Sequence, residues 1–179
     1  MKSSQSLQID CYVDDKFAGL WNHEDSADPT SVKSRSGYLL TLGGCPIWWS
    51  SKLQREITLS TMEAEYVAMS MAMKELLPLQ RIIIEICDSL NVDINKKATI
   101  KSEVWEDNAG ALGLAKLAPP RHMPRSKHYA LKYHWFREFI RLDKIGLNKI
   151  DTKVQLADIL TKSVPSVQFE ELRKLLMGW

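Results

Sequence analysis

The sequence predicts an α/β fold in which helices cover the faces of a mixed sheet. Three strand-like segments come first, which favours antiparallel pairing, and helices then alternate with strands, which favours parallel pairing. The chain has 179 residues, 45% hydrophobic and 26% charged, a composition typical of a globular domain that needs no disulfides. We therefore expect one domain over residues 1–179, with a core at about 7–162 and a C-terminal helix at about 166–178.

The strands are predicted from alternating hydrophobicity and from turn residues between them. Leu7, Ile9, Cys11 and Val13 alternate with polar residues, as the buried face of a strand does. Gly43-Gly44 is typical of a tight hairpin turn between two strands. The predicted strands cover residues 7–13, 37–42, 47–49, 98–105 and 147–151.

The longest predicted helix has a clear start. Ser60 followed by Glu63 forms a capping box, which satisfies backbone donors at a helix N-terminus. The helix should run from about 61 to 90, and Pro78 should kink or divide it. Further helices are expected at residues 108–117, 126–143, 154–161 and 167–177.

Charge and cysteine content exclude several classes of protein. The formal net charge is only +2, but basic residues dominate between 116 and 141, which favours contact with a polyanion. Three widely spaced cysteines without a CxxC pair indicate neither a disulfide framework nor a zinc ribbon. No signal peptide and no run of 18 apolar residues is present, so we expect no membrane contact and an intracellular, cytoplasmic location. The nucleus and virus-like particles are the alternative locations.

Acidic residues stand near the ends of several predicted elements. Asp14 follows the first strand, Asp107 follows the fourth strand, Glu65 lies in the first turns of the long helix, and Asp158 lies in a late helix. Hard cations such as Mg²⁺ prefer oxygen ligands, and a two-metal site uses about four carboxylates around ions roughly 3.5–4 Å apart. Because 22 acidic residues offer many such sets, the surrounding residues must decide among them.

Short motifs surround these acids. They include YVD at 12–14, RSGY at 35–38, LSTMEAEY at 59–66, EDN at 106–108 and LADILTK at 156–162. In order and spacing these motifs closely resemble the ribonuclease H region of copia-type LTR retrotransposons, from about residue 9 to 176. The strings at 59–66 and 156–162 are the most specific.

The resemblance implies a ribonuclease H-like fold with five strands in the order 3-2-1-4-5. It also implies an endoribonuclease that cuts the RNA strand of RNA–DNA hybrids during reverse transcription and leaves 5′-phosphates. Two Mg²⁺ ions, with Mn²⁺ as a substitute, would be held by Asp14, Glu65, Asp107 and Asp158. We expect Asp14 to bridge both ions, Glu65 and Asp107 to complete one site and Asp158 the other, with in-line attack of an activated water. A reverse transcriptase domain in the parent polyprotein is the implied partner.

Two of these acids have an acidic neighbour that could be the metal ligand instead. Asp14 and Asp15 would point to opposite faces of a strand, and the match of YVD to the first strand of the family selects Asp14. Glu63 and Glu65 do not share a helix face, and Glu63 already serves the capping box, so Glu65 is the better ligand.

Contacts with nucleic acid are expected close to the acids and along the basic stretch. Polar groups near the predicted site would contact the hybrid, and basic groups would lie along phosphates, which gives salt-sensitive binding without base specificity. The candidate residues are Arg35, Ser36, Asn108, Arg121, Arg125, Lys127 and His128. The segment before Asp158 carries no histidine, so no proton shuttle is assigned.

Other functions compete with the nuclease hypothesis. A non-catalytic nucleic-acid-binding module, or a polymerase-associated connection domain derived from a retrotransposon, is the main alternative, and a nuclease for branched DNA is another. The string YVDD at 12–15 matches a reverse transcriptase palm motif, but too little chain precedes it. His122, His128 and His134 recur every six residues, whereas zinc ligands on a helix lie four apart.

Overall fold

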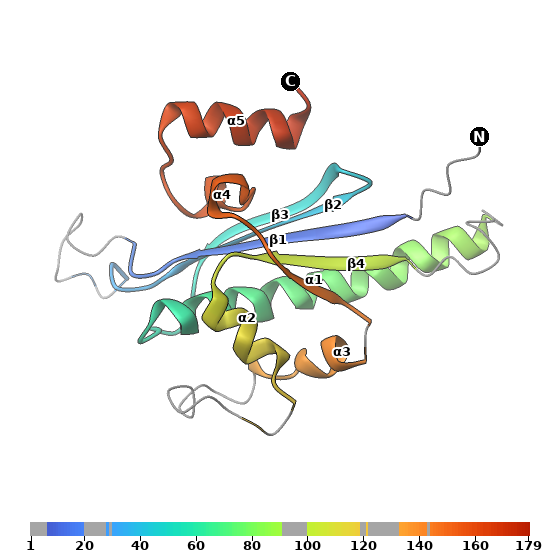
Figure 1. The fold of residues 1–179 in the computed structure, drawn as a ribbon, viewed down its shortest axis with the longest axis horizontal. Coiled ribbons are helices and arrows are strands. Elements are labelled where there is room, and N and C mark those ends of the chain that lie inside the picture. The colour runs from blue at the N-terminus through green and yellow to red at the C-terminus, as the bar shows by residue number, and fades with distance from the viewer. Residues whose placement is uncertain are drawn as a thin grey trace.

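The computed structural model describes residues 7–19, 28, 30–90, 100–118, 121, 133–142 and 144–179. In this part of the chain, five strands form one sheet with helices on both of its faces (Figure 1). The elements in chain order are β1 (Gln8–Lys16), β2 (Arg35–Leu42), β3 (Cys45–Leu53), α1 (Thr61–Ser89), β4 (Lys101–Glu106), α2 (Ala109–Lys116), α3 (Arg137–Arg141), β5 (Gly146–Lys149), a 3-10 helix (Thr152–Val154), α4 (Asp158–Thr161) and α5 (Ser166–Met177).

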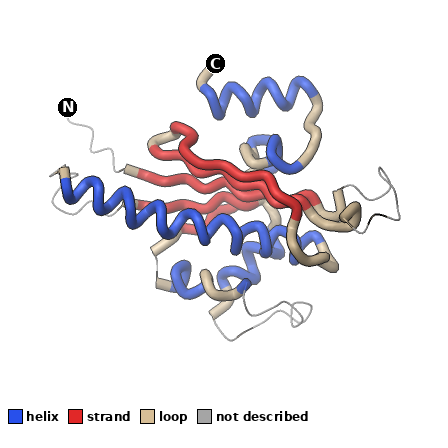
Figure 2. Tube along the Cα trace, turned by 180° about the vertical axis from the view of Figure 1, so that it is seen from behind, coloured by secondary structure: helices blue, strands red, loops and turns tan. Residues whose placement is uncertain are grey.

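The strand order is β3-β2-β1-β4-β5, which confirms the expected order. β1 pairs with β2 and β2 pairs with β3 in antiparallel fashion, whereas β1 with β4 and β4 with β5 are parallel. Helices α1, α2 and α3 lie on one face of the sheet, and α4 and α5 lie on the other (Figures 1 and 2). Among the described helices, none combines the length and apolar character that a membrane span requires.

The hairpin between β2 and β3 forms where the glycine pair predicted it. Gly43 has φ +58° and Gly44 has φ +82°, the left-handed conformations that a tight hairpin turn needs at both central positions. Both strands of this hairpin are longer than the sequence suggested: β2 begins at Arg35, and β3 begins at Cys45 and ends at Leu53. Its central residues are largely exposed, so hydrophobic alternation could not mark its ends.

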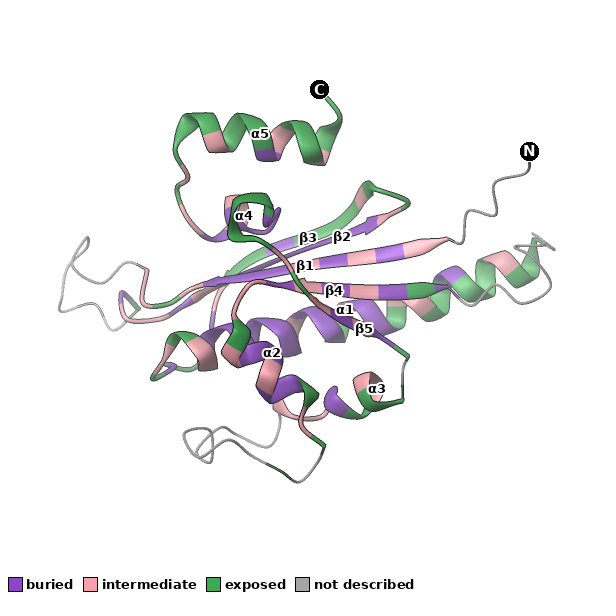
Figure 3. Cartoon of the chain, viewed as in Figure 1, coloured by how far each residue is buried: buried purple, intermediate pink, exposed green. Residues whose placement is uncertain are grey.

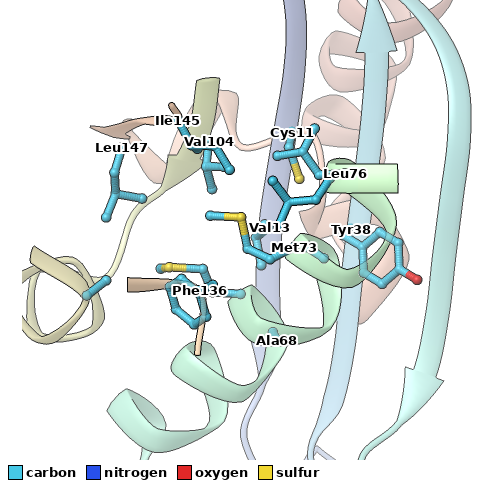
Figure 4. Packing of buried hydrophobic residues seen from close by; sticks show 14 of the residues in the cluster. Cys11, Val13, Tyr38, Ala68, Met73, Leu76, Val104, Phe136, Ile145 and Leu147 are labelled. Atoms are coloured by element: carbon cyan, nitrogen blue, oxygen red, sulfur yellow. The ribbon is translucent and has the colours of Figure 1, made fainter. Parts of the chain in front are cut away.

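The main core lies between the sheet and α1. Ile9, Cys11 and Val13 of β1 are fully buried, as their alternation predicted, and α1 supplies Met73 and Leu76 opposite them (Figure 4). Burial in α1 is concentrated in its N-terminal part, and much of its C-terminal part is exposed (Figure 3). The core therefore fixes the start of α1 against β1, where Glu65 lies.

Helix α1 begins as expected but is not divided by proline. The amide of Glu63 donates to Ser60 Oγ at 3.2 Å, and the carboxylate of Glu63 accepts from the amide of Leu59 at 2.8 Å. The helix runs unbroken through Pro78, so of the two alternatives expected there, a kink or a division, the division was wrong. Pro78 and Lys74 are both exposed, so water can bind the Lys74 carbonyl that loses its amide donor.

Two other predicted helices are replaced by shorter elements. Residues 122–132 and 143 lie outside the described part, and of the rest of the predicted helix at 126–143 only Arg137–Arg141 is helical. The turn before it allows the adjacent Trp135 and Phe136 to pack together against the core. The predicted helix at 154–161 is a 3-10 helix followed by α4, with a break at Gln155, whose side chain binds the strands instead.

Helix α4 lies close to β2 because residue 37 has no side chain. A Cβ atom on Gly37 would lie 2.6 Å from Thr161 Cγ2 and 2.9 Å from Leu160 Cβ. Gly37 is also the register partner of Asp14 in the neighbouring strand. The glycine therefore allows α4 to approach the end of β1.

We expect Gly37→Ala to lower the free energy of unfolding by about 1–3 kcal/mol, the usual effect of forcing a methyl group into packed structure. Gly110→Ala is the matched control. A Cβ atom there meets chiefly the flexible side chain of Met62, and alanine favours the helix. Urea denaturation of both variants tests this, and equal stability of Gly37→Ala and the unchanged protein would contradict the close approach of α4.

Candidate active site

Three of the predicted acids meet where β1 and β4 end. These strands are parallel, so their carboxyl ends lie at the same edge of the sheet, where α/β proteins bind ligands. Asp14 lies just beyond the last β1 residue that pairs with β4, Asp107 follows β4, and Glu65 comes from the second turn of α1. One carboxylate oxygen from each of Asp14, Glu65 and Asp107 lies within 4.8 Å of the others.

A glutamine side chain holds the fork between these strands. The pairing of β1 with β4 ends at Tyr12 and Trp105. Just beyond it, the buried Gln155 amide donates to the Val13 carbonyl at 2.8 Å and to the Trp105 carbonyl at 3.3 Å. Gln155 thus satisfies carbonyl groups that the sheet no longer pairs, and the acids lie at the opening between the strands.

The clustered carboxyl groups are mostly buried. Asp14 is 1% exposed and Glu65 is 4% exposed. Burial, together with the charges of Glu106, Asp14 and other nearby acids, raises the pKa of Glu65 to about 11. Burial also raises the pKa of Asp14 to about 7, although the Thr161 hydroxyl and Lys162 act in the opposite direction. Neighbouring negative charges in a desolvated place favour protons or bound cations.

Asp158, the fourth predicted acid, approaches the cluster from α4 but is not among the three residues that converge. Its carboxylate pairs with Lys162 Nζ at 2.8 Å, and the same ammonium group lies 3.6 Å from Asp14 Oδ1. The Thr161 hydroxyl donates to Asp14 Oδ2. Asp158 is therefore linked to Asp14 through a lysine, and the motif at 156–162 carries three groups of the site rather than one.

Asp15 has a different set of partners, as the alternation of strand residues predicted. Its carboxylate accepts from Ser36 Oγ at 3.0 Å and from Gln54 Nε2 at 2.9 Å. Gln54 also donates to the Ala64 carbonyl at 2.9 Å. These buried hydrogen bonds connect β1 to the first turn of α1, next to Glu65.

A fifth carboxyl group, Glu106, was missed by the sequence interpretation. It is fully buried and accepts the amide of Asn108 at 2.9 Å, and among the described residues its Oε2 has no hydrogen-bond partner. Burial raises its pKa well above the usual value. The alternation of Ser102, Val104 and Glu106 on the buried face of β4 was the signal that could have found it.

The predicted nucleic-acid contacts fall into three groups. Arg35 is half-buried at the start of β2, Arg121 is exposed, and Asn108 caps α2 by accepting the amide of Ala111. Ser36 is almost fully buried against Asp15, so its position does not support the contact that we expected. Three further candidates lie outside the described residues: Arg125, Lys127 and His128.

The basic stretch at 116–141 also needs a correction at Arg137. Arg137 is 2% exposed, and its guanidinium group donates to the carbonyls of Leu117 and Arg121. Arg137 therefore anchors the segment after α2 and cannot lie along a phosphate. Arg141 remains at the surface, paired with Glu138.

Comparison with known proteins yields sequence relatives among transposon polyproteins. The chain is 35% identical over 158 residues to the retrovirus-related Pol polyprotein from transposon TNT 1-94 of Nicotiana tabacum, a match that covers 88% of the chain. It is 31% identical over 174 residues to that from transposon RE2 of Arabidopsis thaliana, covering 97% of the chain. Each match covers 11% of the relative, so the chain spans about a tenth of these polyproteins. No family model matches.

A comparison with solved structures gives the fold. The N-terminal RNase H domain of Rv2228c from Mycobacterium tuberculosis, solved as a fusion with maltose binding protein, aligns with a TM-score of 0.54 and 11% identity. The alignment covers 93% of this chain and 99% of that one. The sequence relatives and the fold together identify the chain as a ribonuclease H-fold domain homologous to one segment of the retrovirus-related Pol polyproteins of copia-type transposons.

Proposed function

We propose that the chain hydrolyses the RNA strand of RNA–DNA hybrids with the help of divalent metal ions. The observation that carries the proposal is the convergence of Asp14, Glu65 and Asp107 at the carboxyl ends of two parallel strands. Burial of like charges destabilises a fold, and such clusters are typical of functional sites. The homology to Pol polyproteins agrees with such a use, since reverse transcription produces RNA–DNA hybrids.

The residues of the site fit a hard divalent cation. Glu65 Oε2 is buried without a hydrogen-bond partner among the described residues, as is Glu106 Oε2 close to it. All potential metal-ligand atoms of the cluster are carboxylate oxygens, the ligands that Mg²⁺ prefers and that Mn²⁺ also accepts. Asp14, Glu65 and Asp107 would hold one ion, and Asp14 with Asp158 would hold a second once Lys162 turns away from them.

The bound ions would activate the attacking water and neutralise charge on the leaving oxygen. The protein groups around them have their own tasks. Thr161 fixes the rotation of the Asp14 carboxylate, and the Thr152 hydroxyl, which donates to Asp107 Oδ2 at 2.6 Å, fixes that of Asp107. Such orientation of ligands in advance is a large part of catalysis in phosphoryl transfer.

A hybrid has a shallow minor groove that displays the 2′-hydroxyls of one strand. Recognition of those hydroxyls would select RNA as the strand to be cut, and phosphate contacts would hold both strands without base specificity. A reverse transcriptase domain of the same polyprotein would supply the hybrid. A non-catalytic binding module is the remaining alternative, and the following variants separate the two functions.

We expect Asp107→Asn to reduce RNA cleavage at least about 100-fold and to leave hybrid binding within about twofold, because the amide removes a charged ligand while keeping its shape. Asp88→Asn, on the exposed end of α1, is the matched control and should cut normally. The measurement is cleavage of a labelled hybrid in Mg²⁺ or Mn²⁺ beside a binding titration in EDTA. Hybrid binding without any cleavage by the unchanged protein would favour the non-catalytic module.

The metal-free protein should lose stability as pH rises. A carboxyl group whose pKa is higher in the folded than in the unfolded state holds extra protons between the two values, so the free energy of unfolding falls there. For Asp14 this range is from about 4 to about 7, and for Glu65 it continues to about 11. We therefore expect the free energy of unfolding in EDTA to decrease from pH 5 to pH 8, and less steeply in Glu65→Gln.

Millimolar Mg²⁺ should remove much of this decrease, because the ions replace protons at the carboxylates and bind the folded state. The stabilisation by Mg²⁺ should accordingly be larger at pH 8 than at pH 5. Urea denaturation at both pH values, with EDTA or with Mg²⁺, measures it. No stabilisation at pH 8 would count against a metal site.

A further inference from the structure

A basic pocket lies beside the acids, on the face of the sheet that α4 covers. Its volume is about 340 Å³, and it is bounded by the turn after β1, the start of β2, the end of β3 and α4. Four cationic side chains line it: Lys16, Lys33, Arg35 and Lys162. Among the described residues that line it, none is acidic, although the proposed metal ligands lie next to it.

The backbone and small residues position these cations. Lys16 and Arg35 are register partners on β1 and β2. The stem of Lys16 lies over Gly19, where a Cβ atom would be 2.6 Å from Lys16 Cδ. Arg35 and Lys16 are both half-buried, so they lose less freedom than fully exposed chains when they bind a ligand.

Hydroxyl groups complete the lining. Ser51 Oγ donates to the Leu160 carbonyl at 2.6 Å, which fastens the end of β3 to α4. Arg35 Nη1 in turn donates to Ser51 Oγ at 3.4 Å. Ser163 also borders the pocket. The hydroxyl proton of Ser51 is taken by Leu160, so the cations are the main donors of the pocket. Several cations in a lining without a carboxylate suit a phosphate group, which offers several acceptor oxygens. Outside the pocket, Asp28 is an acid near Lys33: hydrogen bonds from Thr30 and, to a smaller extent, the charge of Lys33 lower the pKa of Asp28.

Lys162 joins the basic pocket to the acids. Its ammonium group pairs with Asp158 at 2.8 Å and lies 3.6 Å from Asp14, while the residue also lines the pocket. The hydrogen bond with Asp158 and the charge of Asp14 raise the pKa of Lys162 despite its partial burial, which acts in the opposite direction. The pocket thus begins one side chain away from the place where the scissile phosphate would lie.

We propose that the basic pocket binds a backbone phosphate of the strand that is cut, one or two linkages from the scissile phosphate. The inference rests on the proposed function, because it assigns the position of that strand. A phosphate bound there fixes the position of the strand along its axis, so that the scissile phosphate, one or two linkages away, lies beside the acids. Lys162 serves both places and couples the seating of the strand to release of Asp14 and Asp158. Lys16, Lys33 and Arg35 are positioning residues in this scheme.

A coupling experiment tests the pocket. Hybrids that carry a single neutral methylphosphonate linkage, moved stepwise along each strand, are titrated in EDTA so that no hydrolysis occurs. The proteins are the unchanged chain, Lys33→Gln, Arg35→Gln and the control Lys74→Gln, whose lysine is exposed on α1 on the opposite face of the sheet. Cleavage of the unmodified hybrid in Mg²⁺ by the unchanged chain marks the scissile linkage.

We expect Lys33→Gln and Arg35→Gln to weaken binding roughly threefold or more each and to reduce the salt dependence of binding by about one phosphate contact. One methylphosphonate position, within two linkages of the cut on the same strand, should weaken binding by the unchanged chain and by Lys74→Gln. A methylphosphonate at the same position should weaken hybrid binding by the two pocket variants little further, because they have already lost the contact with that phosphate. Urea denaturation checks that the variants fold equally well.

The remaining outcomes are distinguishable. In one outcome the hybrid is bound and cut, but the loss of binding free energy from every neutral linkage simply adds to the loss from Lys33→Gln or Arg35→Gln. The pocket then holds no backbone phosphate, and the nuclease function stands. Coupling that appears only on the uncut strand, or further along the cut strand, also overturns the assignment. If Mg²⁺ and Mn²⁺ support no cleavage at all, the proposed function fails, and the pocket proposal fails with it.

Discussion

Electrostatic repulsion among buried carboxyl groups is the constraint on which the rest of this structure depends. Asp14, Glu65 and Asp107 place oxygens within 4.8 Å of one another at the fork between β1 and β4, with Glu106 buried beside Glu65. In water such groups would separate or take up protons. Here the sheet, α1 and their hydrogen bonds prevent separation. A bound cation would relieve the repulsion, so the repulsion favours binding of a ligand of opposite charge.

The hydrogen bonds around the site hold the elements that carry the acids. Gln155 binds the carbonyls at the strand fork, and Gln54 connects Asp15 to the first turn of α1. Gly37 leaves room for α4, so that Thr161 reaches Asp14. Each of these contacts holds an element that carries an acid of the site.

The distribution of charge around the opening is asymmetric. The acids lie at the end of the parallel strands, and the basic pocket lies beside them on the side of α4. A polyanion that approaches this edge meets positive charge next to a place that attracts metal ions, an arrangement that can both bind a strand and orient it. Lys162 lies at the boundary, because it pairs with Asp14 and Asp158 and also lines the basic pocket.

From the sequence by itself came the cap of α1 and the alternation of β1, which are properties of neighbouring residues. The strand order that the structure confirms was implied by the resemblance of the local motifs to a known family, and the same motifs pointed to Asp14 and Glu65, which the structure places in one cluster with Asp107. The sequence did not show that Gln155 would break a helix to bind two strands, or that Arg137 would be buried. Nor did it show that Lys162 would stand between Asp158 and Asp14. Only the tertiary structure decided these, because each depends on partners distant in the chain that no local pattern specifies.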